Sequence, residues 1–415
     1  MRIVLFLSLI ASSLFVVSCA NPVKYPTKIP VVLISIDGFA NDYLTIYPTK
    51  NLHKIINSGL KAKALLPIFP SKTFPNHLSI ITGVYPQKHG IIHNEFYSRS
   101  LDKTYHLGAG KEEPRWLSSP PLWTIAEQHN IKSAVYFWPE SEAKVQGILP
   151  TYYFSYNKQT PNIDRVNQII DWLKLPSDKK PQFIAGYFSI VDTAGHRYGR
   201  NSPELAQAIR EIDDLIGVLL AKLKSELNNQ VNLIIVSDHG MVQLNENSNI
   251  KWQQIIDNVK DVRVVNGQTQ LLIYSKNKQV LAKLEQQFKK NSANKYIVYN
   301  SDNFPKNWHW QKGHASIPDL VLDANVPFIF QSSKYKNLIK DHFTRATHGY
   351  NRIKSSNLNA IFIAKGVNFK KHSTMPAFEN ISIAPLILHL LDLDNANNNM
   401  DGNYQIFMPY LKTHE

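Results

Sequence analysis

Short apolar runs, each followed closely by a carboxylate or an imidazole, constrain the fold of this 415-residue chain more than any other feature. The first run, Val31–Ile36, ends at Asp37, and comparable runs cover residues 183–191, 231–236 and 359–363. A run that is apolar on both faces is typical of a strand in a parallel sheet that helices cover on both sides. We therefore expect the chain to build its core around such a sheet.

Helical patterns lie between these runs. Residues 203–228 carry apolar side chains at helical spacing, and the alternation of strands with helices predicts an α/β fold with a mostly parallel sheet. Residues 262–330 differ, because shorter strand-like pieces surround one helical stretch at residues 278–290. We expect this part to be a small α+β insertion within a single domain that covers residues 29–415.

Carboxylates and imidazoles follow the predicted strands at the edge where such sheets bind ligands. In parallel α/β sheets, ligands bind beyond the carboxyl ends of the strands. The candidates are Asp37, Asp192, Asp238, His196, His239 and His348. Taken singly, each Asp also fits a turn or a helix cap, and each His fits an ordinary packed residue. Together these oxygen and imidazole donors suit zinc or a similar divalent ion.

The segment Pro70–His77 contains a candidate nucleophile, Thr73. A hydroxyl is a weak nucleophile until a bound metal lowers its pKa. A helix predicted over about residues 76–82 would direct its positive N-terminal end toward Thr73, which suits a phosphate group. The alternative is a plain loop with a helix-capping hydroxyl.

Strings distributed along the chain resemble those of the nucleotide pyrophosphatase/phosphodiesterase family of the alkaline phosphatase superfamily. They are ISIDGF, PSKTFPNH, TGVYPQKHGI, HNEFY, VDTAGHRYG, VSDHGM and THGY. The resemblance implies an alkaline phosphatase-like three-layer α/β/α sandwich. It also implies an enzyme that hydrolyses phosphodiester or pyrophosphate bonds of nucleotides and releases nucleoside 5′-monophosphates through a covalent threonine intermediate.

The same resemblance implies a cofactor of two zinc ions. The ligands of the first ion would be Asp192, His196 and His348. The ligands of the second ion would be Asp37, Asp238, His239 and the Thr73 oxygen.

On the substrate side, the resemblance implies that Asn94 binds a phosphate oxygen and that Phe74 and Tyr156 sandwich a nucleobase. Tyr156 also fits a packing tyrosine, since other aromatic residues surround it in the sequence. Lys72 would help to hold phosphate, or would simply be solvated.

Two further expectations concern residues near these motifs. Glu140 departs from the family pattern, in which Gly is common at this position, and we expect Glu140 on a loop at the pocket edge that affects specificity. We expect His77, His89 and His93 to support the nucleophile loop rather than to ligate zinc.

The N-terminal residues resemble a targeting signal for export. Residues 1–18 resemble a lipoprotein signal peptide, with Arg2, an apolar stretch and the string VVSC that ends at Cys19. Cys19 would then carry the lipid, and residues 19–28 would form a tether to a membrane of the cell envelope, with the outer membrane as the expected one. The enzyme would lie in the periplasm. The alternative is an ordinary signal peptide cut near Ser18 or Ala20. Cys19 is the only cysteine, so no intramolecular disulfide can form.

The net charge of +14 comes from scattered lysines and not from a long basic run, so no specific nucleic-acid binding is expected. The charge fits a solvated surface, or attraction of anionic nucleotides or membranes. Three other functions remain open: a phosphodiesterase for phospholipid-derived or choline-type head groups, a phosphomonoesterase, and a binding protein without activity.

Overall fold

A computed structural model describes residues 29–330, 344–397 and 399–412 of the chain. The predicted signal peptide, the lipidation site at Cys19 and the tether up to residue 28 lie outside the described residues.

An eight-stranded sheet organises the domain, in the order β19-β2-β18-β9-β1-β8-β6-β7. Strand β1 lies near the centre of the sheet and pairs in parallel with β8 and β9, so that the buried apolar runs predicted from the sequence lie side by side. The strands are β1 (Val31–Ile36), β2 (Leu60–Ala62), β6 (Ser133–Tyr136), β7 (Tyr152–Phe154), β8 (Phe183–Phe188), β9 (Asn232–Val236), β18 (Phe362–Gly366) and β19 (Ser373–Met375).

Strand β18 differs from the expectation in position and direction. It begins at Phe362 and runs antiparallel to both β9 and β2. A buried apolar run reads the same in both directions, so its composition does not reveal its orientation. The run at residues 183–191 is also shorter than predicted, since β8 ends at Phe188, where its pairing with Ile36 ends.

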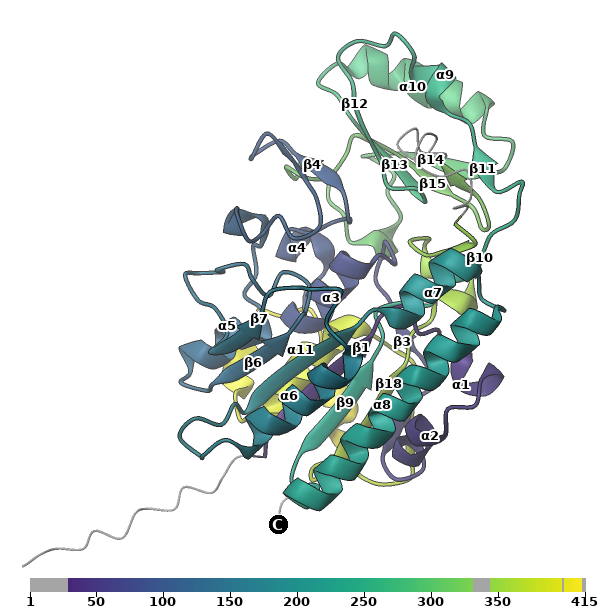
Figure 1. Cartoon of the computed structure of the whole chain (residues 1–415). Helices are drawn as coiled ribbons and strands as arrows, with labels where there is room; N and C mark the ends of the chain where they lie inside the picture. Colours follow the sequence, from purple (N-terminus) through teal and green to yellow (C-terminus); the bar gives the residue numbers. More distant parts are fainter. Residues whose placement is uncertain (1–28, 331–343, 398, 413–415) are drawn as a thin grey trace, which may run out of the picture.

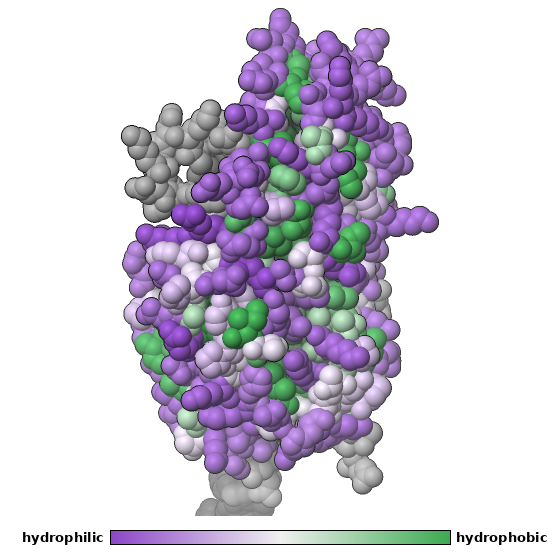
Figure 2. Space-filling model, turned by 90° about the vertical axis from the view of Figure 1, so that its right-hand side faces the viewer, coloured by the Kyte–Doolittle hydropathy of each residue, from purple (hydrophilic) through white to green (hydrophobic). Residues whose placement is uncertain are grey.

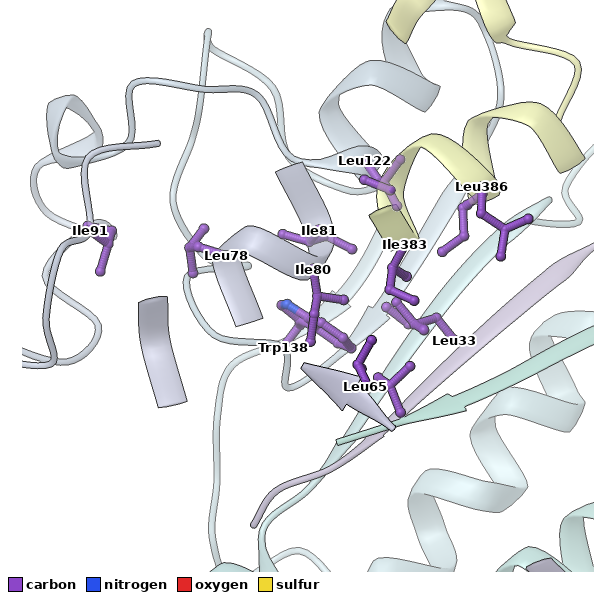
Figure 3. Close-up of a cluster of buried hydrophobic side chains, with 14 of the residues drawn as sticks. Leu33, Leu65, Leu78, Ile80, Ile81, Ile91, Leu122, Trp138, Ile383 and Leu386 are labelled. Carbon is purple, nitrogen blue, oxygen red and sulfur yellow. The ribbon is translucent and has the colours of Figure 1, made fainter. Parts of the chain in front are cut away.

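Helices cover both faces of the sheet, which confirms the three-layer sandwich (Figure 1). Alternate side chains of β1 explain why both faces are covered: Val32 and Ile34 pack toward α6 and α8, whereas Leu33 packs toward α3 and α11 (Figure 3). The helices are α1 (Tyr43–Ile46), α2 (Lys50–Ile56), α3 (Thr73–Thr82), α4 (Pro86–His89), α5 (Leu122–Gln128), α6 (Asn162–Lys174), α7 (Ile190–Tyr198), α8 (Pro203–Leu227), α9 (Gln253–Ile256), α10 (Lys278–Lys290) and α11 (Ile383–Leu390).

The longest of these helices, α8, begins and ends as its sequence predicts. Ser202 caps its N-terminus, because the Ser202 hydroxyl accepts a hydrogen bond from the Leu205 N–H at 3.1 Å. Asn228 ends it in a left-handed conformation, with φ of 49°.

A second sheet stands apart from the first, at the top of Figure 1. Its order is β12-β13-β15-β14, its pairs are antiparallel, and α10 packs against it. Its strands are β12 (Arg263–Asn266), β13 (Gln270–Tyr274), β14 (Tyr296–Asn300) and β15 (Leu320–Ala324). This is the α+β insertion of the predicted fold class.

Short elements complete the described fold. The remaining strands form two-stranded pairs: β3 (Leu65–Leu66) with β20 (Phe378–Glu379), β4 (Phe96–Ser98) with β5 (Lys103–Tyr105), β10 (Val242–Gln243) with β17 (Ala346–Thr347), and β11 (Asn249–Ile250) with β16 (Ile329–Phe330). The 3₁₀ helices cover Pro114–Trp116, Lys306–Trp308, Arg352–Lys354, Ser356–Leu358, Asn380–Ser382, Asp394–Asn397 and Tyr404–Tyr410.

Within the described ranges, no helix combines the length and the apolar character that a membrane span requires. Figure 2 shows a face on which hydrophilic side chains predominate and hydrophobic ones occur in small separate groups.

Candidate active site

The carboxyl ends of β1, β8 and β9 meet at one edge of the sheet. Asp37 follows β1 directly, and Asp238 and His239 follow β9. Asp192 lies in the first turn of α7, and its backbone N–H donates to the Asp37 carbonyl at 3.1 Å. The approach requires Gly38, since a Cβ there would lie 2.8 Å from the Asp192 Cα.

A first cluster consists of Asp192, His196 and His348. The two imidazole Nε2 atoms lie 3.1 Å apart. Asp192 Oδ1 lies 3.4 Å from His196 Nε2 and 3.7 Å from His348 Nε2. The helical spacing of four residues within α7 and the loop after β17 together bring these three side chains to one point.

A second cluster consists of Asp37, Asp238 and His239. His239 Nε2 lies 2.9 Å from Asp238 Oδ2 and 3.5 Å from Asp37 Oδ1. The Thr73 hydroxyl lies 3.3 Å from the same His239 Nε2. The His239 and His348 rings stack at 3.6 Å, so the two clusters adjoin.

The three imidazoles direct their Nε2 atoms into the site. Their Nδ1 atoms lie within 2.9 Å of the carbonyl oxygens of Ala346, Ser71 and Gly240. A carbonyl can only accept a hydrogen bond, so each Nδ1 carries a proton, and the Nε2 of a neutral ring directs its lone pair inward. Lone pairs at such separations repel each other unless a cation binds them.

The carboxylates each leave one oxygen for a cation. Tyr187 donates its hydroxyl to Asp37 Oδ2 at 2.5 Å, and the Gly38 N–H donates to Asp238 Oδ1 at 3.1 Å. Asp37 Oδ1, Asp192 Oδ1 and Asp238 Oδ2 are buried and make no hydrogen bond. Buried, unpaired carboxylate oxygens are costly unless a metal coordinates them, so these residues fit divalent ions of the zinc type.

The ionisation of the site supports the same conclusion. Burial, together with the Asp238 and Asp192 carboxylates, raises the pKa of Asp37 well above its ordinary value. Burial, together with the neighbouring His239, Lys72 and His196 side chains, lowers the pKa of His348 well below its ordinary value. His348 is therefore neutral at physiological pH, which is the state that binds metals.

Thr73 is the first residue of α3, which begins three residues earlier than the sequence predicted. The sequence predicted a start near Asn76, but the helix also includes Pro75, and proline is tolerated in the first turn of a helix. The N–H groups at the N-terminus of α3 therefore lie directly beside the Thr73 hydroxyl. Asn94 Oδ1 accepts a hydrogen bond from the Phe74 N–H at 3.0 Å, so Asn94 lies at the same helix end.

Comparison with known proteins agrees with this geometry. Residues 31–351 match the family model described as type I phosphodiesterase / nucleotide pyrophosphatase. The chain belongs to this family.

Its relatives in this family include proteins of animals and of a yeast. Ectonucleotide pyrophosphatase/phosphodiesterase family member 1 of Mus musculus is 34% identical over 89% of the chain and 41% of its own length. A venom phosphodiesterase of Naja atra is 34% identical over 89% of the chain and 45% of its own length. An uncharacterized pyrophosphatase/phosphodiesterase of Schizosaccharomyces pombe is 32% identical over 91% of the chain and 80% of its own length. The chain thus spans about two fifths of the length of the mammalian relatives.

Solved structures confirm the fold. Murine ectonucleotide pyrophosphatase / phosphodiesterase 5 has a TM-score of 0.82 and 27% identity, over 92% of this chain and all of that one. A second structure of the murine protein, inactivated by a threonine-to-alanine substitution, is a complex with AMP and has the same TM-score of 0.82.

The two aromatic residues predicted to sandwich a nucleobase differ in their burial and in the residues that they pack against. Phe74 is half-buried and packs edge-to-face on Tyr105, with ring centroids 6.5 Å apart. Tyr156 is 51% exposed and contacts Phe137 at 5.3 Å, so it is a surface aromatic and not a buried packing residue.

Lys72 is buried and not solvated. Its side chain passes Gly349, where a Cβ would lie 2.3 Å from the Lys72 Cε. Burial lowers the pKa of the Lys72 ammonium to about 8, and the Asp192 carboxylate opposes this shift. Within the described ranges, the ammonium has no hydrogen bond or ion pair, which leaves it for an anionic ligand.

Glu140 does not lie at the pocket edge as expected. It is 6% exposed, and its Oε1 accepts hydrogen bonds from the Tyr105 hydroxyl and from the Gly108 N–H. Its φ of 62° is a conformation that glycine adopts more readily than glutamate, which fits the glycine that the family resemblance implies at this position. The sequence showed the departure from glycine but not the direction of the side chain.

The three supporting histidines stay outside the two clusters. His77 Nδ1 lies 2.9 Å from the Thr73 carbonyl and 3.4 Å from Asp238 Oδ2, and its Nε2 lies 2.8 Å from Ser35 Oγ. His89 Nε2 lies 3.2 Å from Ser79 Oγ on α3, and His93 Nε2 lies 3.3 Å from Gln270 Oε1.

Sequence reasoning missed Tyr187, which holds one oxygen of Asp37, and Ser71, whose carbonyl orients His348. Tyr187 sits inside an apolar run, so its hydroxyl was the only signal. Ser71 acts through its backbone, which gives no signal in the sequence.

Proposed function

We propose that the protein is a zinc-dependent hydrolase of nucleotide phosphodiester and pyrophosphate bonds that releases nucleoside 5′-monophosphates. The observation that carries the proposal is the pair of adjoining Asp/His clusters, with unpaired carboxylate oxygens, beside the Thr73 hydroxyl at a helix N-terminus. The relatives' names, which combine pyrophosphatase with phosphodiesterase, support the same reaction class.

In this proposal, two zinc ions occupy the two clusters. One is held by Asp192, His196 and His348, and the other by Asp37, Asp238, His239 and the Thr73 oxygen. Bound zinc supplies Lewis acidity, which stabilises charge on phosphoryl oxygens and lowers the pKa of a coordinated hydroxyl.

Thr73 acts as the nucleophile. Its hydroxyl loses the proton to solvent, and its oxygen forms a bond to phosphorus. The bond from phosphorus to the leaving oxygen breaks in the same step, and that oxygen takes the electron pair. Asn94 and the N–H groups of α3 stabilise the nonbridging oxygens during this step. Water then cleaves the Thr73–phosphorus bond and releases the nucleoside 5′-monophosphate. The murine relative supports a role for threonine, since its inactive form carries a threonine-to-alanine substitution.

Phe74 and Tyr156 hold the nucleobase between their rings, and Lys72 contributes positive charge on the phosphate side. The murine complex with AMP supports an adenine nucleotide as a ligand of this fold.

A phosphodiesterase for choline-type head groups is the second candidate. A cationic head group requires acidic and aromatic side chains together. The Tyr156 N–H donates a hydrogen bond to Glu142 Oε2. The Lys111 ammonium already pairs with this carboxylate, 2.9 Å from its Oε1. This pairing favours the nucleotide, and a phosphomonoesterase has no specific support.

A substrate panel tests the proposal. The purified protein is stripped with chelator, reloaded with zinc and assayed on p-nitrophenyl-TMP, ATP, AMP and glycerophosphocholine. We expect hydrolysis of the first two, with TMP and AMP as products, and loss of activity in the stripped protein. Hydrolysis of glycerophosphocholine alone would refute the nucleotide assignment.

We also propose that Cys19 carries a lipid that anchors the enzyme to the cell envelope, with the enzyme in the periplasm. The string VVSC after an apolar stretch supports this. Cells given radiolabelled palmitate should label the parent protein and not the Cys19→Ala variant. Equal labelling of both would refute the anchor.

A further inference from the structure

A cavity lies at the opposite end of the main sheet from the candidate active site. It measures about 340 Å³ and lies between the C-terminal end of α8 and the end of β18. Apolar side chains form much of its lining: Leu220, Leu223, Val231, Leu233 and Val367. Val231 precedes β9 and Asp238 follows it, so this strand connects the two sites.

Two lysines line this cavity, and a third lies near them on α8. Lys365 and Lys371 line it, and Lys224 on α8 acts on Lys365 through its charge. Burial, Lys371 and Lys224 together lower the pKa of the Lys365 ammonium. Within the described residues, none of the three ammonium groups has a hydrogen bond or an ion pair. Three like charges around a half-apolar cavity therefore lack a compensating anion.

The described chain begins beside this cavity. The Asn232 N–H donates to the Pro30 carbonyl at 2.9 Å, and Asn232 pairs with Gly366, which lines the cavity. Figure 1 shows the start of the described chain and the lower end of α8 at one end of the molecule, with the insertion at the other. The apolar N-terminal stretch of the sequence therefore joins the domain at the end that carries the lysines.

We propose that this end of the molecule is a membrane-docking surface, at which Lys224, Lys365 and Lys371 bind the head group of an anionic phospholipid. The positive charges match the head group, and the apolar lining suits the first carbon atoms of its acyl chains. The entry of the N-terminal stretch beside the cavity favours a membrane over a free anion. Each lysine near an anionic surface strengthens binding by about fivefold.

Docking in this orientation directs the candidate active site away from the membrane. The carboxyl ends of β1, β8 and β9 then face the aqueous phase, and substrates arrive from solution. This inference does not depend on the chemistry of the active site.

Vesicle partitioning of the full chain tests the docking surface. Partition coefficients are measured on vesicles of pure phosphatidylcholine and on vesicles with about 30% phosphatidylglycerol. We expect the parent to prefer the anionic vesicles, and the triple variant Lys224→Gln/Lys365→Gln/Lys371→Gln to lose at least about tenfold of that preference. The N-terminal stretch, with Arg2, Lys24 and Lys28, is the same in the parent and the variant, so its contribution cancels when their preferences are compared.

A matched control removes the same charge elsewhere. Lys276, Lys278 and Lys283 are exposed residues of the insertion, and their triple Gln variant should keep the preference of the parent. The triple Arg variant at 224, 365 and 371 should keep it too, and guards against a loss caused by unfolding. Equal preference in the parent and the first Gln variant, or an equal loss in the control, would overturn the proposal.

Discussion

The Glu140 carboxylate accepts a hydrogen bond from the Tyr105 hydroxyl at 2.5 Å, and both side chains are buried. The Tyr105 ring in turn packs against Phe74, the residue after the candidate nucleophile. Glu140 therefore holds Tyr105 in place behind Phe74, one of the two aromatic residues of the proposed nucleobase site, without contacting the two Asp/His clusters.

Because Glu140 is buried, we expect the free energy of unfolding to depend on pH. Burial raises the pKa of Glu140 to about 7, from an ordinary value of about 4.5. The folded state then binds the proton more tightly than the unfolded state, so stability falls as the pH rises from about 4.5 through about 7. Glu140→Gln removes this loss. Its advantage in unfolding free energy over the parent should grow by about 2 to 3 kcal/mol between pH 5 and pH 9.

Urea denaturation at several pH values measures this difference. Glu142→Gln is the control, because Glu142 is only partly buried and pairs with Lys111 at the surface. A Glu140→Gln advantage that stays constant with pH would show that Glu140 titrates normally.

Thr73→Ala should lower kcat on p-nitrophenyl-TMP by at least about 1,000-fold, because the variant lacks the nucleophile. Zinc content should stay near that of the parent, since the other ligands remain. Thr82→Ala, in the last turn of the same helix, should leave kcat nearly unchanged. Near-parental turnover by Thr73→Ala would refute its role as the nucleophile.

His348→Ala should lose zinc, because His348 closes the first cluster and stacks on His239 of the second. We expect elemental analysis to find at least one ion fewer per chain, with a matching loss of activity. His89→Ala removes an equally buried imidazole outside both clusters and should keep the full metal content. Unchanged zinc in His348→Ala would remove it from the ligand set.

Tyr156→Ala should raise KM for nucleotide substrates by about tenfold with kcat nearly unchanged, since stacking on a base is lost but the reacting groups stay in place. The KM for bis-p-nitrophenyl phosphate, which has no nucleobase, should change little. Tyr153→Ala is the matched control, because Tyr153 is a neighbouring surface aromatic. An equal rise in KM for both substrates would argue against base stacking.

The central strands and the polar residues at their ends follow directly from the sequence. Fully buried strands need apolar side chains on both faces, so continuous apolar runs in the sequence predict β1, β8 and β9. The direction of β18 was not visible, because direction depends on the path of the connecting chain and not on the composition of the run.

The surroundings of the site were harder to predict, since they depend on contacts between distant residues. Glu140 was expected at a rim, yet its positive φ turns the side chain inward to Tyr105. Lys224 and Lys365 look like ordinary solvated charges in the sequence, and only the folded structure brings α8 and β18, which carry them, close together.

The order of the site residues along the chain determines when the first cluster can form. Asp37 lies near the start of the described chain, whereas His348 follows the whole insertion. A chain that stops within the insertion therefore contains Thr73 and the three carboxylates but lacks His348. Such a fragment cannot complete the first cluster, so it lacks one of the ligands that the proposed activity requires.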